Sequence, residues 1–547
     1  MKNLALLIIF NMIACTLYSQ QGWTTQNSGT TSPLRDIFMV DQYTGWIVAH
    51  QNTILKTTDG GENWFEQTPL LVPYYYDVYF IDNQTGWILG EYETIAHTTD
   101  GGDTWETQTS PGHNPGDIFF INADTGWIAG GRTQGFPGPS PLREILHTGD
   151  GGNTWAIQYQ VDFEFPLGSI HFADDQTGCT VGDLSAILFT TDGGENWTQQ
   201  TSPVSSNLEE VYMKSPTEGW IVGTDGVILH TTDGGANWNQ ISSGTTYSLT
   251  DVDFINEKGW ISGGSNDDAT ILYNDGLTES WTMQDPGTTD YLSAISFVDE
   301  KYGWAVGFNG TIVHTTTGGM PLTDYDLQLK VFLEGPFNGT DMTPALNPGN
   351  IPLQHPYNTP PWNYTGSESV PALPSADIID WVLIEVRDAT DAASAGESTV
   401  IDRGAAFLLK DGTIRDLDAS SHPVFGLYVA DSLYVVVHHR NHLSVMSSVA
   451  LTETGGIYPY DFSASDQNTF GGPSGIKELI PATWGMIGGD GNADGSVDSD
   501  DKVNIWENEA GSAGYLYGDF DMDTQDNNTD KAELWELNEG YSSQVPD

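Results

Sequence analysis

Cysteine and basic residues are scarce in this chain of 547 residues, which contains 2 cysteines and only 17 lysines and arginines. Asp and Glu together number 75, so the formal net charge is −58 at pH 7. Binding to nucleic acid or to an anionic membrane surface depends on clustered basic side chains that pair with phosphates. We therefore expect neither, and the excess of carboxylates favours divalent cations instead.

Long apolar segments are missing too. Residues 1–19 place Lys2 before an apolar run that is too short to span a bilayer, which is typical of an export signal. We expect a secreted protein without a transmembrane segment, with lipid anchoring through Cys15 as an open alternative. Cleavage after Ser19 would leave Cys179 as the one cysteine, which excludes an internal disulfide in the mature chain.

A repeat of about 40 residues fills the region 20–321. Its most regular feature is a Gly-Trp pair, with Gly178-Cys179 in one slot and tryptophan in the others, which are Trp46, Trp87, Trp127, Trp220, Trp260 and Trp304. This interval suits a four-stranded sheet repeated around an axis. The copies predict a seven-bladed β-propeller over 20–321, in a chain that is mainly β.

Most Gly-Trp strands are followed by the turn motif Thr-x-Asp-Gly-Gly-x-x-Trp, whose aspartates are Asp59, Asp100, Asp150, Asp192 and Asp233. An Asp side chain accepts backbone N–H groups and the glycines permit positive φ, so we expect these aspartates to be structural. The seventh copy, at 315–319, lacks both Asp and Trp. We expect residues 23–26 to supply the last strand of that blade and to close the ring.

The turn motif resembles the Asp-box, or bacterial neuraminidase (BNR) repeat. Together with the Gly-Trp-Ile-Val-Gly segment at 219–223, it is similar to the propellers of photosystem II assembly and stability factors. The resemblance covers roughly residues 23–319 and implies the fold. It leaves function open, because such repeats occur in sialidases, other glycosidases, receptors and non-catalytic scaffolds.

Three groups of ring residues are candidates for function. A sialidase would need three arginines around its substrate carboxylate, and the ring contains Arg35, Arg132 and Arg143; the last two share one repeat, so we do not expect a sialidase. Acids before the inner strands keep a glycosidase open, although their recurrence favours a structural role; they are Asp77, Asp117, Glu209 and Asp251. The insertion 131–143 and the tyrosines 74–76 are candidates for partner or sugar contact.

The periodicity stops after Pro321, and strand patterns over 325–485 predict a β-sandwich module. The module resembles an uncharacterised domain of secreted bacterial proteins, which implies no activity. Its histidines His438, His439 and His442 are possible zinc ligands. On an extended strand, however, His438 and His442 are too far apart to share an ion unless the chain turns at Arg440-Asn441. We interpret the cluster as structural.

Two twelve-residue segments in the C-terminal region 486–547 place oxygen ligands at positions 1, 3, 5, 7, 9 and 12, as a calcium loop requires. Loop 1 comprises Asp490, Asn492, Asp494, Ser496, Asp498 and Asp501, and loop 2 comprises Asp519, Asp521, Asp523, Gln525, Asn527 and Asp530. Gly495 occupies the turn position of loop 1, and Thr524 replaces it in loop 2. We expect two bound calcium ions.

Paired loops closed by aspartate, each followed by one short helix, resemble a type I dockerin with EF-hand-like loops over 488–540. The resemblance implies calcium-dependent folding and docking on a protein partner. Its partner-contact positions hold 499–500 and 528–529 beside acidic helices, which argues against a cohesin in particular.

Together these patterns predict a secreted, non-catalytic binding or scaffold protein with a propeller, a β-sandwich and a dockerin-like calcium tail. Two alternatives remain. One is an extracellular glycoside hydrolase or carbohydrate-binding component of polysaccharide breakdown, in which the propeller face binds glycan. The other is an assembly factor resembling the photosystem II propellers.

Overall fold

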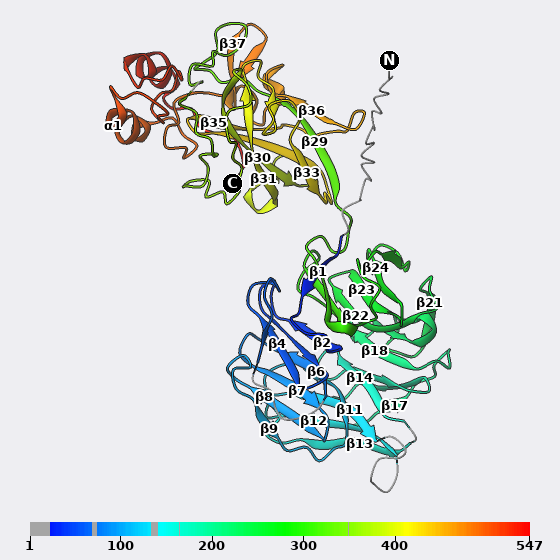
Figure 1. Cartoon of the computed structure of the whole chain (residues 1–547). Coiled ribbons are helices and arrows are strands. Elements are labelled where there is room, and N and C mark those ends of the chain that lie inside the picture. The colour runs from blue at the N-terminus through cyan, green and yellow to red at the C-terminus, as the bar shows by residue number, and fades with distance from the viewer. Residues whose placement is uncertain (1–21, 68–73, 133–140, 164, 348, 547) are drawn as a thin grey trace, which may run out of the picture. The chain divides into compact units, whose positions relative to one another are not determined.

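The computed structural model describes residues 22–67, 74–132, 141–163, 165–347 and 349–546 (Figure 1). The chain forms two compact units, Met1–Pro321 and Leu322–Asp547. The expected export signal at 1–19 lies outside the described residues, as does most of the insertion at 131–143. No helix in the described ranges is long and apolar enough to cross a membrane.

The first unit, as far as it is described, is a ring of seven four-stranded antiparallel sheets. The strands of each blade are given from the inner strand outward. Blade one comprises β2 (Leu34–Met39), β3 (Gly45–Ala49), β4 (Thr53–Thr57) and β5 (Phe65–Glu66), and blade two comprises β6 (Tyr75–Phe80), β7 (Gly86–Gly90), β8 (Thr94–Thr98) and β9 (Glu106–Gln108). Blade three comprises β10 (Pro115–Phe120), β11 (Gly126–Arg132), β12 (Leu142–Thr148) and β13 (Ala156–Asp162), and blade four comprises β14 (Leu167–Phe172), β15 (Gly178–Gly182), β16 (Ala186–Thr190) and β17 (Thr198–Gln199). Blades five and six are β18 (Leu208–Met213), β19 (Gly219–Gly223), β20 (Val227–Thr231) and β21 (Asn239–Ser242); and β22 (Ser248–Ile255), β23 (Lys258–Ser265), β24 (Asp268–Asn274) and β25 (Thr282–Gln284).

The seventh blade joins the two ends of the ring. Its inner strands are β26 (Leu292–Phe297), β27 (Gly303–Gly307) and β28 (Thr311–Thr315), and its outer strand is β1 (Thr24–Asn27). β1 pairs antiparallel with β28, with Thr24 opposite His314. Each inner strand contacts the next around the circle, including β26 against β2. This confirms the expected β-propeller and its closure by the N-terminal strand.

Five of the repeated tryptophans connect their blade to the next one. The indole N–H of Trp46 donates to the Gly101 carbonyl at 3.0 Å, in the turn motif of the following blade, and Trp304 donates in the same way to Gly60 at 3.1 Å. Equivalent bonds are made by Trp87, Trp127 and Trp260. The Trp220 indole nitrogen has no partner because the motif of the next blade has diverged to Asn274-Asp275-Gly276.

The turn motif is a small hydrogen-bonded cap. In the first blade, the Thr57 hydroxyl donates to Asp59 Oδ1 at 2.9 Å and accepts from the Gly61 N–H at 2.9 Å, and Asp59 Oδ1 also accepts from the Asn63 N–H at 3.0 Å. Gly60 and Gly61 have φ angles of 73° and 87°, which residues other than glycine rarely adopt. The same bonds recur at Asp100, Asp150, Asp192 and Asp233, which confirms that these aspartates are structural.

The second unit contains two larger sheets around one apolar core. The five-stranded sheet has the order β32-β31-β30-β34-β35, and the three-stranded sheet has the order β33-β29-β36, in which β29 and β36 are parallel. The bounds are β29 (Thr323–Lys330), β30 (Ile378–Asp388), β31 (Val400–Leu409), β32 (Ile414–Arg415), β33 (Val424–Leu427), β34 (Leu433–His439), β35 (His442–Met446), β36 (Tyr458–Asp461), β37 (Lys477–Ile480) and β38 (Thr483–Gly485). Single 3-10 turns lie at Glu397–Thr399, Asp466–Asn468 and Gly472–Ser474 in this unit, and at Thr224–Gly226 and Phe308–Gly310 in the first unit.

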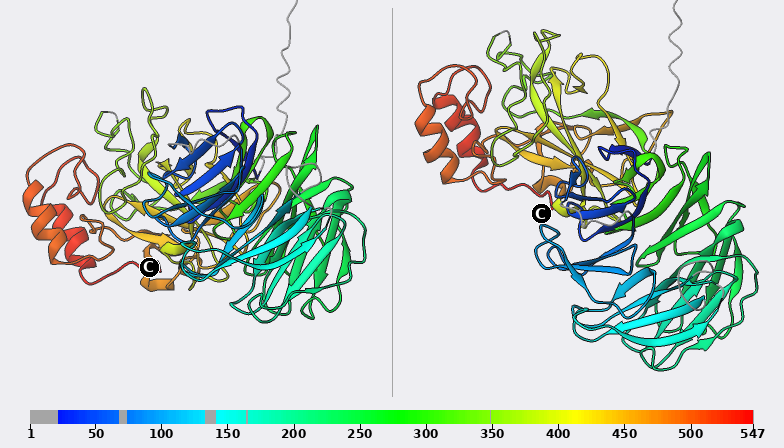
Figure 2. Two further views of the ribbon diagram at one scale, coloured as in Figure 1. Left: turned by 90° about the horizontal axis from the view of Figure 1, so that it is seen from below. Right: turned by 60° about the horizontal axis from the view of Figure 1, so that its bottom comes forward.

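Two short helices end the second unit. Helical turns at Asp501–Trp506 continue into α1 (Glu507–Glu509), and those at Asp530–Trp535 continue into α2 (Glu536–Asn538). The two helical segments lie side by side in both views of Figure 2 and contact each other. Residues of the tail share an apolar cluster with Leu443 of β35. The subdivision expected at 485/486 therefore falls within one compact unit.

Candidate functional site

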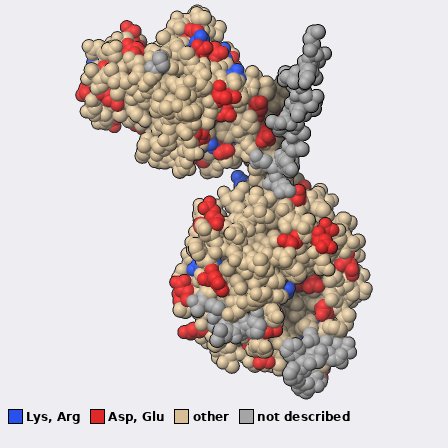
Figure 3. All heavy atoms as spheres, viewed as in Figure 1, with Lys and Arg blue, Asp and Glu red and all other residues tan. Residues whose placement is uncertain are grey.

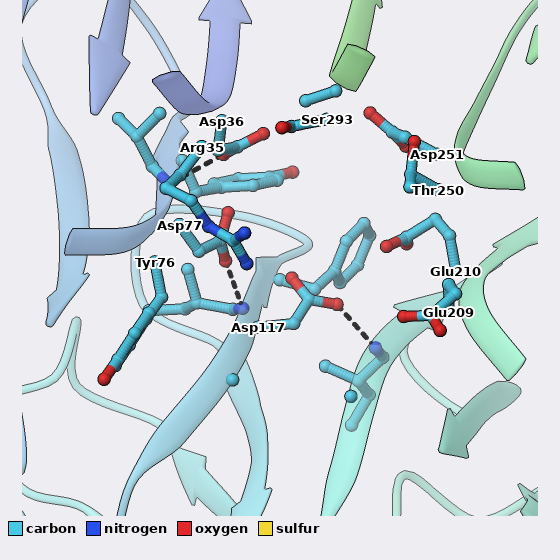
Figure 4. Close-up of a pocket in the computed structure, with 18 of the residues that line it drawn as sticks. Arg35, Asp36, Tyr76, Asp77, Asp117, Glu209, Glu210, Thr250, Asp251 and Ser293 are labelled. Atoms are coloured by element: carbon cyan, nitrogen blue, oxygen red, sulfur yellow. Dashed lines mark hydrogen bonds between the residues drawn. The ribbon is translucent and has the colours of Figure 1, made fainter. Parts of the chain in front are cut away.

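A cavity of about 700 Å³ lies at the centre of the propeller, where the inner strands of all seven blades converge (Figure 4). Every inner strand carries a β-bulge near its start, at Arg35, Tyr76, Gly116, Gly168, Glu209, Thr250 and Ser293. A bulge re-aims the side chains on either side of it. All seven bulged residues line the cavity, and so do the residues that follow them, except Ser169.

The residues after the bulges form a ring of mostly acidic side chains, which we call the acid ring: Asp36, Asp77, Asp117, Ser169, Glu210, Asp251 and Ala294. Most of these acids bond to the neighbouring blade. Asp36 Oδ2 accepts from the Val78 N–H at 2.8 Å, and Asp77 Oδ2 accepts from the Ile118 N–H at 2.6 Å. Asp117 and Asp251 do the same with Ile170 and Ile295. The acid ring therefore ties blades together, as the recurrence in the sequence suggested.

Glu210 differs from the other members of the acid ring. Its Oε1 accepts from the Ser169 hydroxyl at 2.6 Å, and Ser169 Oγ in turn accepts from the Val211 N–H at 3.1 Å. The backbone N–H of Val252, which Glu210 would reach by analogy, bonds instead to Asp251 Oδ1 at 2.7 Å. Figure 4 shows the Glu210 carboxyl pointing into the cavity beside Glu209.

Electrostatics in the cavity are dominated by acids. Burial raises the pKa of Asp36 and Asp117, and it raises the pKa of Asp77 and Asp251 well above the usual range. At Asp77 the neighbouring charges of Asp117 and Asp36 add to the effect of burial. Further along β22, burial raises the pKa of Asp253, which also lines the cavity, to about 6. The described lining contains one arginine, Arg35, and no lysine. The Arg35 side chain extends toward Asp77 in Figure 4. A cation placed here would relieve this repulsion.

Sequence reasoning found part of this site. It named Asp77, Asp117 and Asp251, which lie in the acid ring, and Glu209, which lies at the mouth one residue out of register. It missed Asp36, Glu210 and Asp253. The signal that could have found Asp36 and Glu210 is their position directly before a buried Ile or Val, which is shared by every acid of the ring.

The arginines and tyrosines of the ring divide between structure and cavity. Arg143 is buried, donates to the carbonyls of Phe165 and Asp183 at 3.1 and 3.0 Å, and stacks on Phe163 at 3.7 Å, whereas Arg35 lines the cavity. The three arginines of a sialidase are therefore not assembled in the cavity. Of the tyrosines 74–76, Tyr75 is buried and Tyr76 lines the cavity.

The structure places the residues that the sequence named as calcium ligands in two loops of the tail, at 490–501 and 519–530. Asp490, Asp501, Asp519 and Asp530 are buried, and the others are half-buried or exposed. The closing carboxylates hold the loops in shape: Asp501 accepts from the Gly491 and Asp498 N–H groups at 2.8 Å each, and Asp530 accepts from Asp521 and Asn527 at 3.0 and 2.8 Å. The loops also exchange bonds, because Trp506 donates to the Asn527 carbonyl at 2.9 Å and Trp535 to the Asp498 carbonyl at 2.8 Å.

The donor sets of both loops fit a calcium ion. In loop 1, Asp490 is 3% exposed and its Oδ1 has no hydrogen-bond partner. In loop 2, oxygens of Asp519, Asp521 and Asp523 lie within 4.8 Å of one another. Burial raises the pKa of Asp490 to about 8 and that of Asp519 to about 7. A bound calcium ion would supply the positive charge that compensates these buried carboxylates.

The three histidines considered as zinc ligands, His438, His439 and His442, make hydrogen bonds to neighbouring side chains. His438 Nδ1 bonds to the Ser444 hydroxyl at 2.8 Å. His439 and His442 are buried with their Nδ1 atoms 3.1 Å apart, and His439 Nε2 lies 3.3 Å from Asp380. Their neighbours in this structure fit the structural interpretation.

Acidic side chains greatly outnumber basic ones on the face of both units shown in Figure 3.

Comparison with known proteins adds a sequence relationship. A family model described as photosynthesis system II assembly factor YCF48 matches residues 68–160, 157–245 and 203–273. No curated protein matches the chain.

Three solved structures resemble the chain in part. YCF48 bound to D1 peptide has 22% identity and a TM-score of 0.45, over 54% of this chain and 97% of that chain. YCF48 from Cyanidioschyzon merolae has 18% identity and a TM-score of 0.44, over 54% of this chain and 98% of that chain. The WD40 β-propeller domain of Doa1 has 10% identity and a TM-score of 0.44, over 54% of this chain and 95% of that chain. By sequence, the propeller is similar to the YCF48 assembly-factor family over 68–273.

Proposed function

We propose that this protein is a non-catalytic recognition protein whose propeller binds a positively charged segment of a partner protein in the central cavity. Eight carboxylic acids and one arginine line that cavity, so a cationic segment is the complementary ligand. Tyr76, Tyr92 and Tyr291 add aromatic surface of the kind that anchors protein partners. The sequence match to an assembly-factor family supports partner binding. Of the two alternatives to a binding protein, the assembly factor agrees better with this match than the glycoside hydrolase does.

The non-catalytic assignment rests on four acids of the ring that are committed to backbone bonds, namely Asp36, Asp77, Asp117 and Asp251. A glycosidase needs two carboxyl groups roughly 5 Å or more apart, with the sugar between them. Here Asp36, Asp77 and Asp117 interact side chain to side chain, and each also holds an N–H group of the next blade. Such groups are occupied before any substrate arrives.

A peptide selection with the full-length chain tests this proposal. Random twelve-residue peptides displayed on phage would be selected on the wild-type protein, and their affinities compared for the double variant Glu209→Gln/Glu210→Gln. The matched control is Glu62→Gln/Glu106→Gln, which removes the same charge from exposed positions. We expect the cavity variant to weaken binding at least tenfold and the control to leave it unchanged. Binders that ignore the cavity variant would contradict the proposal.

We further propose that the tail, which resembles a type I dockerin, binds two calcium ions and docks a protein partner, and that the protein is exported. The unpartnered Asp490 Oδ1 and the convergent oxygens of loop 2 support calcium binding. Calcium titration of the chelator-treated chain by calorimetry should show two sites. Asp490→Asn should remove one, Asp519→Asn the other, and Asp500→Asn, an exposed position of loop 1, neither. Absence of binding heat in the wild type would contradict it.

A further inference from the structure

The turn between β34 and β35 reaches the entrance of loop 2 through buried hydrogen bonds. Asn441, which is fully buried, donates its side-chain amide to the Asp519 carbonyl at 2.8 Å and to the Tyr517 carbonyl at 3.4 Å. Arg440 donates to the carbonyl of Leu516. Because Asp519 is the first ligand position of loop 2, this turn fixes where the loop begins.

Arg440 is held in turn by the β module. Asp380 in β30 accepts from Arg440 Nε at 2.8 Å, and its other oxygen accepts from the Tyr515 hydroxyl at 2.7 Å. The Tyr515 ring lies 4.2 Å from the Arg440 guanidinium carbon. Asp380 and Arg440 are both fully buried, and separating such a pair leaves an uncompensated charge. The chain before loop 2 is therefore bound to the five-stranded sheet.

Loop 1 has its own anchor on the same unit. Glu334 Oε2 accepts from the Gly488 N–H at 3.2 Å and from the Asn538 side-chain amide at 2.7 Å. Asn538 also donates to the Gly488 carbonyl at 2.9 Å. Between the anchors lies one apolar cluster shared by the sheet and both loops, formed by Leu443, Ile487, Val497, Phe520, Leu534 and Trp535. The cluster therefore packs residues of both loops against Leu443 of β35.

We propose that Asn441 and Arg440 are positioning residues for calcium in loop 2, so that calcium binding by the tail and stability of the β module form one coupled equilibrium. The proposal rests on the calcium binding proposed above. Groups that orient a metal loop from outside typically change affinity by roughly 10- to 100-fold when they are removed. In this chain they lie in the turn between β34 and β35, outside the loop itself. An ion bound only in the native unit therefore stabilises that whole unit.

Asn441 is the residue to replace, because it is uncharged and its loss leaves the Arg440–Asp380 pair in place. With calcium alone as the probe and the full-length chain, we expect Asn441→Ala to weaken one of two calorimetric sites about tenfold and to leave the other unchanged. The matched control Asn528→Ala removes an exposed amide of loop 2 itself and should change neither site. Unchanged affinities at both sites in Asn441→Ala would overturn the proposal.

Hydrogen exchange of the wild-type chain gives a second test that needs no variant. Adding calcium should slow amide exchange in 433–446, which covers β34 and β35, as well as in the tail, and leave the propeller unaffected. Calcium binding with protection confined to 486–546 would overturn the coupling and leave the calcium proposal standing. A wild-type chain that binds no calcium would overturn both.

Discussion

The indole N–H of Trp23 donates to Gln284 Oε1 at 2.9 Å, across 261 residues of sequence. Trp23 is fully buried, and its ring packs edge-on against Phe297 with 5.8 Å between centroids. Two tryptophans of the turn motif make the same kind of bond to a glutamine, Trp64 to Gln26 at 3.4 Å and Trp155 to Gln108 at 3.3 Å. The seventh motif has lost that tryptophan, and the N-terminal strand returns it from the other end of the ring.

Replacing Trp23 with alanine should therefore destabilise the propeller strongly. Removing a buried tryptophan costs roughly 3–5 kcal/mol, and here it also loosens the strand that closes the ring. Urea unfolding of the full-length chain measures the change in free energy. The control is Phe65→Ala, because Phe65 is 58% exposed on an outer strand. Equal effects of the two variants would refute the role of Trp23 as a latch.

The turn motifs make a second prediction through their threonines. Thr98 is 2% exposed, and its hydroxyl accepts from the Gly102 N–H at 2.9 Å. Thr98→Val keeps the shape but leaves that N–H unpaired, which costs about 1–3 kcal/mol. Thr107→Val, on an exposed outer strand, should cost less than about 0.5 kcal/mol. Chemical denaturation compares the two variants, and indistinguishable midpoints would argue against the cap.

Asp253 predicts how propeller stability depends on pH. Its pKa is raised from 3.8 to about 6 by burial, so the folded state binds this proton more tightly than the unfolded state does. The stability that the protonated form provides is present below pH 3.8 and is lost as pH rises through 6. Asp253→Asn removes the titration and should reduce the loss of unfolding free energy over this window by at most about 1.4 kcal/mol per pH unit.

Thermal or urea unfolding from pH 4 to pH 6.5 measures that slope, with exposed Asp103→Asn as the control. The absolute stability of Asp253→Asn is expected to fall as well, since Asp253 accepts from the Phe254 and Phe297 N–H groups at 2.8 and 2.7 Å. The slope is therefore the diagnostic quantity. An unchanged slope would mean that other acids of the cavity control the dependence.

The propeller was predictable because its repeats are encoded locally. A Gly-Trp pair and an Asp-Gly-Gly turn specify a strand and its cap wherever they occur, and the truncated seventh motif indicated which strand was missing. The site was predictable only in part, because bulges at positions such as Glu209 decide which side chains enter the cavity. A bulge shifts the alternation of faces by one residue, and the sequence of one strand does not reveal it.

The tail shows the same division. Oxygen spacing was enough to predict candidate ligands in both loops, since each loop is a contiguous segment. The contact from Asn441 to the Asp519 carbonyl joins residues 78 positions apart and could not be read from spacing. Asp526 is similar: it occupies the slot that Val497 fills in loop 1, is fully buried, and neither carboxylate oxygen has a hydrogen-bond partner. No side chain described here explains that carboxylate.

Site-specific photocrosslinking tests the central claim, that a partner segment binds in the cavity, most directly. A photoreactive phenylalanine analogue would replace Tyr76, which lines the cavity, or Phe65, which lies exposed on an outer strand, in the full-length chain. With a cationic peptide from the selection described above, the account predicts crosslinking from position 76 and not from 65, abolished by Glu209→Gln/Glu210→Gln. Equal crosslinking from both positions, or crosslinking from 76 that survives the double substitution, would contradict it.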